Sequence, residues 1–299
     1  MDIKLSDAEK IFLIHGAEAG FRNDGRGCED FRPIIVERGA LSSTDGSARV
    51  RLDTTDILVG VKCDLQFFED GLVPDSRLRF SVDCSANASP QFEGKGGDLF
   101  AEDIVSMLEA VYDNSYILPD IKKLQVSPNH CWIIYVDIVI LQYGGNIADA
   151  CSIGTIAALN NTQICVVNPR PADANRMTIE LPDSGETWSL NIEKLPILIT
   201  VSKVGTANIV DCCTNEEACV KSALVIGVSP PPKPNSSNDS CIISLVRQTA
   251  GGSLENQSAE DMIDTAVRVS RGLHKSLRAR FAEEESSEEL RLPGETFLS

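Results

Sequence analysis

The sequence predicts a mixed α/β or α+β fold with two related-looking halves. The segment 131–141 (CWIIYVDIVIL) is apolar on both alternating faces except at Asp137, which is typical of a strand covered on both sides. Apolar residues recur at helical spacing from about Asp98 to Tyr112, and again after the turn Gly144-Gly145. Strand-like segments precede and follow these helices, and a long helical pattern closes the chain.

Length and composition limit the function classes. The chain has 299 residues, of which 42% are hydrophobic and 24% charged, so wholesale disorder is excluded. No apolar run approaches the roughly 20 residues needed to span a bilayer, and the N-terminus lacks the apolar core of a secretory signal. Ten cysteines are too few for a disulfide scaffold, so a reducing, intracellular compartment fits best, without a membrane partner.

The net charge argues against a protein that wraps nucleic acid with its whole surface. Lys and Arg total 27 against 44 Asp and Glu, which gives −17. One local basic stripe remains on the last predicted helix, at Arg268, Arg271, Lys275 and Arg278. It could contact RNA phosphates, but a stripe that is solvated or paired with acids is the favoured interpretation, because an acidic tail follows at once.

The first half is predicted element by element. Residues 1–20 form a short amphipathic helix, 57–65 alternate as a strand with one buried face, and Leu78 to Val82 form a partner strand. Gly94 to Gly97 break the chain before the helix that begins near Asp98. After Gly145, Asn146 is expected to cap a helix whose small residues suit close packing on a sheet.

The second half predicts short strands and one long helix. The strands are expected at 164–167, 177–181, 197–203, 223–228 and 241–246. The Pro-rich stretch 229–240 is predicted to be an extended loop, because proline lacks the N–H that a sheet needs. Ser258 and Asp261 resemble a capping box that opens the last helix, and the acidic segment from Glu283 is predicted to be disordered.

Most motifs for chemistry are absent. No Gly-rich phosphate loop, no spaced Cys or His pairs for zinc and no GxSxG elbow occur, so no metal or cofactor is expected. One acidic grouping remains, in which Asp211 precedes Glu217 by six residues. Paired carboxylates can hold Mg²⁺ or act as general acid and base. On spacing alone, a solvated loop or helix N-terminus is the favoured interpretation.

Several short motifs, taken in order, resemble the RNase PH family, and within it the ring subunits of the eukaryotic RNA exosome. The resemblance extends from about Leu5 to about Leu277. It rests on DGRG at 24–27, FRP at 31–33, GSARV at 46–50, TDILVGVK at 55–62, FEGKGG at 92–97, WIIYVD at 132–137, GGN at 144–146 and VD at 210–211 with EEAC at 216–219.

The resemblance implies a fold and an assembly. The fold would be RNase PH-like, related to ribosomal protein S5 domain 2, with two pseudo-symmetric βαββα halves at 21–190 and 191–282. The N-terminal helix at 1–20 and a disordered acidic tail at 283–299 would flank them. The partners would be five other RNase PH-like ring subunits, three RNA-binding cap subunits, attached hydrolytic nucleases, and RNA threading the channel. The location would be the nucleus and nucleolus, and also the cytoplasm.

Departures from the family's active pattern imply a pseudoenzyme. Active members carry an Asp-Gly-Gly-Thr-Arg motif where this chain reads Tyr143-Gly144-Gly145-Asn146-Ile147, so the arginine position is Ile147. A second arginine-rich stretch falls near Gly96, where only Lys95 is basic. Arginines suit phosphate and RNA oxygens, so Asp211 and Glu217 would be a vestigial acidic pair. The alternatives are an active phosphate-dependent 3′–5′ exoribonuclease, or a free RNA-binding module, which the acidity disfavours.

The resemblance also suggests where RNA would be contacted. The family places the region of Arg77, Arg79 and Lys95 near the pore, so these three are channel candidates. The ordinary alternative is that all three are solvated surface groups.

Overall fold

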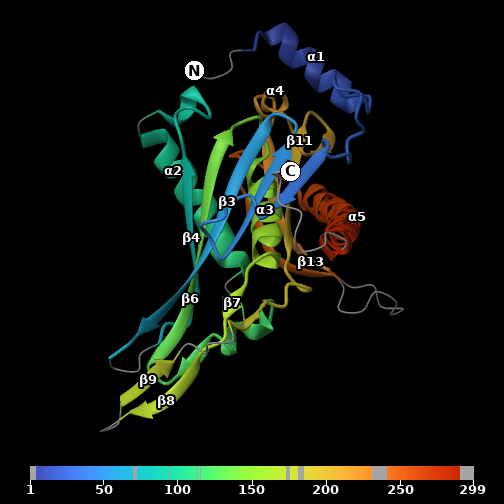
Figure 1. The fold of residues 1–299 in the computed structure, drawn as a ribbon. Coiled ribbons are helices and arrows are strands. Elements are labelled where there is room, and N and C mark those ends of the chain that lie inside the picture. Colours follow the sequence, from blue (N-terminus) through green and yellow to red (C-terminus); the bar gives the residue numbers. More distant parts are fainter. Residues whose placement is uncertain are drawn as a thin grey trace.

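A computed structural model describes residues 5–69, 73–93, 95–112, 114, 116–172, 176–180, 185–230 and 241–289. Two sheets enclose a central helix, and further helices cover the outside of this arrangement (Figure 1). No helix among these residues combines the length and apolarity needed to cross a membrane.

The larger sheet belongs to the first half of the chain. Its strand order is β1-β2-β3-β6-β4, with β5 paired to β6 at one end, and only the β4–β6 pairing is parallel. The strands are β1 (Ile34–Arg38), β2 (Gly46–Leu52), β3 (Thr55–Phe67), β4 (Leu78–Cys84), β5 (Gln125–Ser127) and β6 (His130–Gln142). The predicted strands at 57–65, 78–82 and 131–141 are therefore confirmed.

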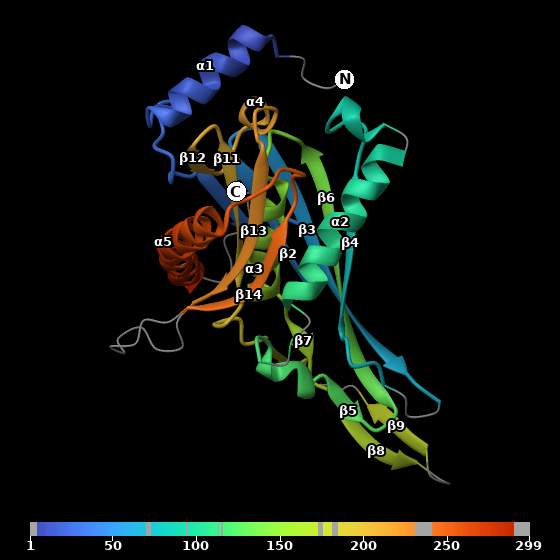
Figure 2. The same ribbon diagram turned by 180° about the vertical axis from the view of Figure 1, so that it is seen from behind.

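The prediction that β6 is covered on both sides is wrong. Its inner face is buried, but Tyr135 and Val139 on the other face are half-buried, and Asp137 and Leu141 are exposed. The reason is that α2 (Lys95–Tyr112) and α3 (Ile147–Asn160) pack on the same side of the sheet, and Figure 2 shows α2 in front of β4 and β6. From Tyr135 to Leu141, the outer face of β6 has no covering helix or strand among the described residues.

The smaller sheet belongs to the second half and is antiparallel throughout, in the order β12-β11-β13-β14. Its strands are β11 (Ile197–Val204), β12 (Ala207–Val210), β13 (Ser222–Ser229) and β14 (Ile242–Gln248). Short pairs connect the halves: β7 (Ile164–Cys165) with β10 (Thr187–Trp188), and β8 (Asn168–Ala172) with β9 (Arg176–Glu180). Residues 231–240 of the predicted Pro-rich loop lie outside the described residues.

Helix α3 lies between the two sheets and joins them into one core (Figures 1 and 2). Every residue from Asp149 to Leu159 is buried, which confirms the predicted small-residue face. Gly154 shows why small residues are needed, since a Cβ there would lie 2.8 Å from Val59 Cγ2 and 2.9 Å from Ile57 Cδ1. Tight packing of this kind leaves no room for an added methyl group.

The remaining helices are peripheral. Helix α1 (Asp7–Glu18) begins at a capping box between Ser6 and Glu9 and packs against β11 and β12. Short turns of helix lie at η1 (Pro90–Phe92), η2 (Pro119–Lys122) and α4 (Thr214–Glu217). Helix α2 begins at Lys95 and not near Asp98, so residues 95–97 of the predicted break form the first turn of the helix, and Gly94 lies outside the described residues.

Two predictions about the last helix are wrong. Helix α5 spans Asn256–Glu289, so Ser258 lies inside it, where its hydroxyl accepts a hydrogen bond from Lys203 Nζ at 2.8 Å. The predicted disordered tail is helical from 283 to 289, and 290–299 lie outside the described residues. Arg38 of β1 accounts for the added turns, because its guanidinium pairs with Glu284 at 2.6 Å and donates to the Phe281 carbonyl at 3.2 Å.

Arg38 is therefore expected to fix the end of α5. Its side chain is 8% exposed, so Arg38→Ala leaves Glu284 without this cation and should lower the free energy of unfolding by about 2 kcal/mol. Amide hydrogen exchange in residues 278–286 should become faster. Lys275→Ala, an exposed change on the same helix, is the control. Unchanged exchange in the Arg38 variant would show that this contact does not hold the helix end.

Candidate functional site

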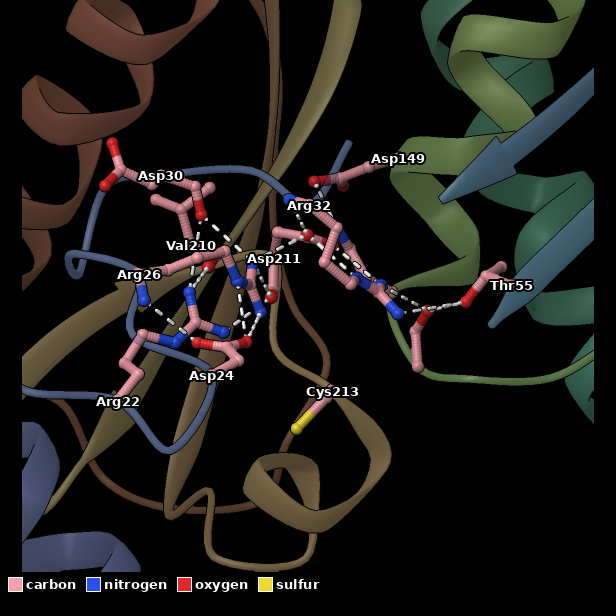
Figure 3. A network of polar contacts seen from close by, with 12 residues as sticks. Arg22, Asp24, Arg26, Asp30, Arg32, Thr55, Asp149, Val210, Asp211 and Cys213 are labelled. Atoms are coloured by element: carbon pink, nitrogen blue, oxygen red, sulfur yellow. Dashed lines mark hydrogen bonds and ion pairs between the residues drawn. The ribbon is translucent and has the colours of Figure 1, made fainter. Parts of the chain in front are cut away.

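Three arginines from one short segment converge on the predicted acidic region. Arg22, Arg26 and Arg32 lie on the loop between α1 and β1, and Figure 3 shows them around Asp211. Arg22 and Arg32 are only 6% and 4% exposed. Buried charges of this kind need paired partners, and the partners come from the second half of the chain.

Asp211 is the centre of this network. It follows β12 with a left-handed φ of 50° and is fully buried. Its Oδ1 accepts from Arg32 Nη2 at 2.7 Å and from Asn146 Nδ2 at 2.8 Å. Its Oδ2 accepts from the Arg32 backbone N–H at 2.7 Å, from Arg32 Nε at 2.9 Å and from Arg26 Nη1 at 2.9 Å. Burial alone would raise the pKa of Asp211, yet the hydrogen bonds and charge of Arg32 hold that pKa below its ordinary value.

Arg32 also fixes the turn that follows β6. Its Nη1 donates to the Gly144 carbonyl at 2.9 Å and its Nη2 to the Gly145 carbonyl at 3.1 Å. The two glycines are required, because Gly145 has φ of 94° and a Cβ on Gly144 would lie 2.2 Å from Thr54 Oγ1. The geometry of this turn therefore depends on a buried arginine 112 residues away in sequence.

Arg22 performs the same task for α4. It pairs with Glu216, donating from Nε to Oε1 at 2.8 Å, and it donates from Nη2 to the Asp211 carbonyl at 2.8 Å. Glu216 Oε2 also accepts from the Cys213 N–H at 2.9 Å, which caps this short helix. The guanidinium groups of Arg22 and Arg32 are thus engaged in hydrogen bonds and ion pairs within the chain.

Glu217 has different surroundings from Asp211. It is half-buried, and its two oxygens accept from the Tyr143 hydroxyl at 2.6 Å and from the Asn146 N–H at 2.8 Å. Asn146 occupies the N-cap position of α3, as predicted, but it has a left-handed φ of 56° and its side chain makes no capping hydrogen bond. Its amide group instead donates to Asp149 at 3.0 Å and to Asp211 at 2.8 Å.

Asp149 is the one buried carboxyl of this region without an arginine partner among the described residues. It is fully buried and accepts from the Thr200 hydroxyl at 2.6 Å and the Thr200 N–H at 3.0 Å. Burial raises its pKa to about 7, against which the hydrogen bonds from Thr200 act only in part.

A cavity of about 180 Å³ opens beside this network, between α2, the start of α3 and the second sheet. We call it the Glu217 cavity. Its lining residues are Phe100, Asp103, Ile104, Met107, Tyr143, Asn146, Ile147, Ala148, Thr200, Glu217, Val225 and Thr249. Among these lining residues, all within the described part of the chain, there are two carboxylates and no lysine, arginine or histidine.

Comparisons with known proteins identify the family of this chain. The family model described as 3′ exoribonuclease family, domain 1 (RNase PH) matches residues 30–165. The exosome complex component Rrp42 of Methanopyrus kandleri is 30% identical over 269 residues, covering 90% of this chain and 95% of that protein. The chain belongs to the RNase PH family. A Dictyostelium discoideum member, provisionally described as an exosome complex exonuclease RRP42, is 30% identical over 274 residues, covering 76% of this chain and 85% of its own.

Solved structures agree with the RNase PH-like fold. A chain of the Archaeoglobus fulgidus exosome with RNA bound to the active site has a TM-score of 0.71 and 26% identity, covering 92% of this chain and 98% of its own. A chain of an archaeal exosome core has a TM-score of 0.70 and 23% identity, covering 91% of this chain and 97% of its own. The predicted RNase PH-like fold is confirmed.

The three channel candidates have different surroundings in the structure. Arg77 donates to the Ile121 carbonyl and, at 3.2 Å, to Gln125 Oε1. Arg79 at the start of β4 and Lys95 at the start of α2 are exposed. Arg79 lies near the first end of β4, whereas the first turn of α2 lies at the other end, where Gly97 approaches the Cys84 carbonyl. The structure therefore does not bring Arg79 and Lys95 together. Their contact with RNA stays a prediction.

The basic stripe on α5 is largely occupied. Arg268 pairs with Glu29 at 3.0 Å and Arg278 donates to the Glu193 carbonyl at 2.7 Å. Both contacts agree with the interpretation of a paired or solvated helix face.

The motifs at 24–27 and 31–33 contain Arg26 and Arg32, for which no role was predicted from the sequence. A usable signal was present, because three arginines fall within eleven residues beside Gly and Pro in a strongly acidic chain.

Proposed function

We propose that this chain is a non-catalytic, structural subunit of an RNA exosome ring that supports 3′–5′ RNA processing and degradation. The observation that carries the proposal is the Glu217 cavity, which lies at the segments 143–147 and 211–217 yet has no basic residue among its described lining. Phosphorolysis brings inorganic phosphate and the RNA backbone together, and both are anions. A cavity lined by Glu217 and apolar side chains gives these anions a like charge and no cationic partner among its described lining residues.

The nearby arginines do not supply the missing cationic group for phosphate. Arg22 and Arg32 are buried, and their guanidinium groups are engaged by Glu216, Asp211 and backbone carbonyls. Releasing either one would leave a buried carboxylate without its partner, which costs about 3–5 kcal/mol. Each absent charge-assisted contact also removes about 3–4 kcal/mol of transition-state stabilisation. Both energies disfavour catalysis at this site.

The comparisons support the assembly part of the proposal. The relatives named above are exosome components, and two similar solved chains are parts of archaeal exosomes. We propose five other RNase PH-like ring subunits, three RNA-binding cap subunits and hydrolytic nucleases as partners, with RNA in the channel. Arg79 and Lys95, both exposed, are the channel candidates that the structure leaves free of a described ion pair. We place the assembly in the nucleus, nucleolus and cytoplasm.

A second candidate is an active phosphate-dependent 3′–5′ exoribonuclease. Two observations favour it: both acids of the pair are retained, and one relative is described as an exonuclease. It would need arginines from a neighbouring chain to complete the site.

Native mass spectrometry of the tagged chain, isolated gently from its own cells, tests the assembly. We expect one copy of this chain in a large complex with five related chains and larger cap subunits. A homo-oligomer would contradict the proposal and return Asp211 and Glu217 to consideration as catalytic residues.

The purified chain is expected to release no nucleoside diphosphate from RNA in the presence of phosphate. The physical reason is the missing cationic site for phosphate in the Glu217 cavity. Thin-layer chromatography of labelled products, with an active RNase PH-type enzyme run in parallel, measures this. Phosphate-dependent diphosphate release above the no-enzyme background would exclude the non-catalytic role.

A further inference from the structure

Asn146, in the wall of the Glu217 cavity, carries a buried acceptor without a donor. Asn146 is 4% exposed and lines the cavity, and its Oδ1 is buried without a hydrogen-bond partner. Its Nδ2 is already committed to Asp149 and Asp211. A buried, unsatisfied carbonyl oxygen costs about 1–3 kcal/mol, so a ligand that donates a hydrogen bond to it would be favoured.

The second feature is a carboxylate without an ion pair among the described residues. Glu217 accepts hydrogen bonds from the Tyr143 hydroxyl and the Asn146 N–H, both neutral donors. No lysine or arginine among the described residues forms an ion pair with it. Burial together with the negative charge of Glu217 raises the pKa of Tyr143. The other acid of the cavity, Asp103, is already paired with Arg247.

The walls suit a planar or tetrahedral organic cation. The rings of Phe100 and Tyr143 meet edge to face with centroids 6.1 Å apart, and Ile104, Met107 and Val225 complete the apolar lining. Aromatic faces attract cations most strongly where water is excluded. A volume of about 180 Å³ is small, and it fits the end of one side chain better than a nucleotide.

We propose that the Glu217 cavity binds a guanidinium or ammonium group, supplied by an arginine or lysine side chain of a neighbouring chain. The cation would donate hydrogen bonds to Asn146 Oδ1 and Glu217 and pack against the rings of Phe100 and Tyr143. The electrostatic preference of the site is thereby opposite to that of a phosphate site. The source of the cation rests on the proposed function, which supplies the neighbouring chains, whereas the preference for cations does not.

The test of the preference is a titration followed by methyl NMR. The chain has four methionines, and Met107 lines the cavity while Met262 is buried elsewhere, so ¹³C-methyl labelling gives one reporter and one internal check of folding. Methylguanidinium chloride, added at constant ionic strength, should shift the Met107 signal saturably and leave Met262 unmoved. Sodium phosphate should not shift Met107.

Two variants assign the effect. Glu217→Gln should weaken methylguanidinium binding at least tenfold, whereas Glu102→Gln, the same charge change at an exposed position of α2, should leave it unchanged. Equal binding by the wild type and the Glu217 variant would overturn the proposal. A saturable response to phosphate with none to methylguanidinium would do so as well.

The assembled ring identifies the source of the cation. If a neighbour's side chain fills the cavity, the Met107 response to methylguanidinium should be lost on assembly. A response that persists in the ring would overturn the proposal that a neighbouring chain supplies the cation. It would assign the cavity to a free small-molecule cation. These outcomes are separate from failure of the proposed function, which would appear as phosphorolysis or as a homo-oligomer.

Discussion

Asp211→Asn is expected to lower the free energy of unfolding by about 3–5 kcal/mol, because it leaves the buried Arg32 guanidinium without its counter-charge. The loss extends beyond one ion pair. Asp211 also accepts from Arg26 and Asn146, so the substitution weakens the contacts that join the 22–32 segment to the second half. Urea unfolding of the two proteins at pH 7 measures the difference.

Glu217→Gln is the matched comparison and is expected to cost less than about 1 kcal/mol. Glu217 is half-buried and bonds to two neutral donors, and a glutamine can accept from the Asn146 N–H while donating to the Tyr143 hydroxyl. A catalytic pair has no reason to differ in this way. Equal losses of stability at the two positions would contradict the assignment of Asp211 as the structural centre.

Asp149 is expected to make stability depend on pH, and Asp149→Asn should remove that dependence. The pKa of Asp149 is about 7 in the folded protein and about 4 in the unfolded chain. Between these values the folded state holds the extra proton, so stability from this group falls as the pH rises from about 4 to about 7. The full change is at most about 4 kcal/mol.

Urea unfolding of wild type and Asp149→Asn at several pH values from 4 to 8 isolates this contribution. Asparagine is neutral and keeps the contacts to Thr200 and Asn146, since its amide can donate to the Thr200 hydroxyl. The variant should gain stability relative to wild type as the pH rises. Parallel pH profiles would show that Asp149 is not protonated in the folded protein.

The fold was largely predictable because its strands and helices carry local periodic patterns. The alternation at 57–65 and the apolar run at 131–141 correspond to β3 and β6, and the small residues after Gly145 correspond to α3. The uncovered face of β6 was not predictable, because Val139 and Leu141 are apolar whether or not a helix covers them. Burial of each face of β6 depends on the side of the sheet on which α2 and α3 pack.

The site was predictable only in part, because its partners are distant in sequence. Asp211 and Glu217 were identified as a pair, but Arg32 is 179 residues from Asp211 and Arg22 is 194 residues from Glu216. No local pattern reports such contacts. The acidic start of the tail was misjudged for the same reason, since the arginine that holds Glu284 lies 246 residues earlier, in β1.

The measurement that tests the central claim most directly compares phosphate-dependent RNA decay by the assembled ring with wild-type chain or with Glu217→Gln. Both would be assayed at equal concentrations of intact ring, as determined by native mass spectrometry. We expect identical rates of nucleoside diphosphate release, because this chain contributes structure and not chemistry. A tenfold or greater loss of phosphorolysis in the variant ring would show that Glu217 belongs to a working active site.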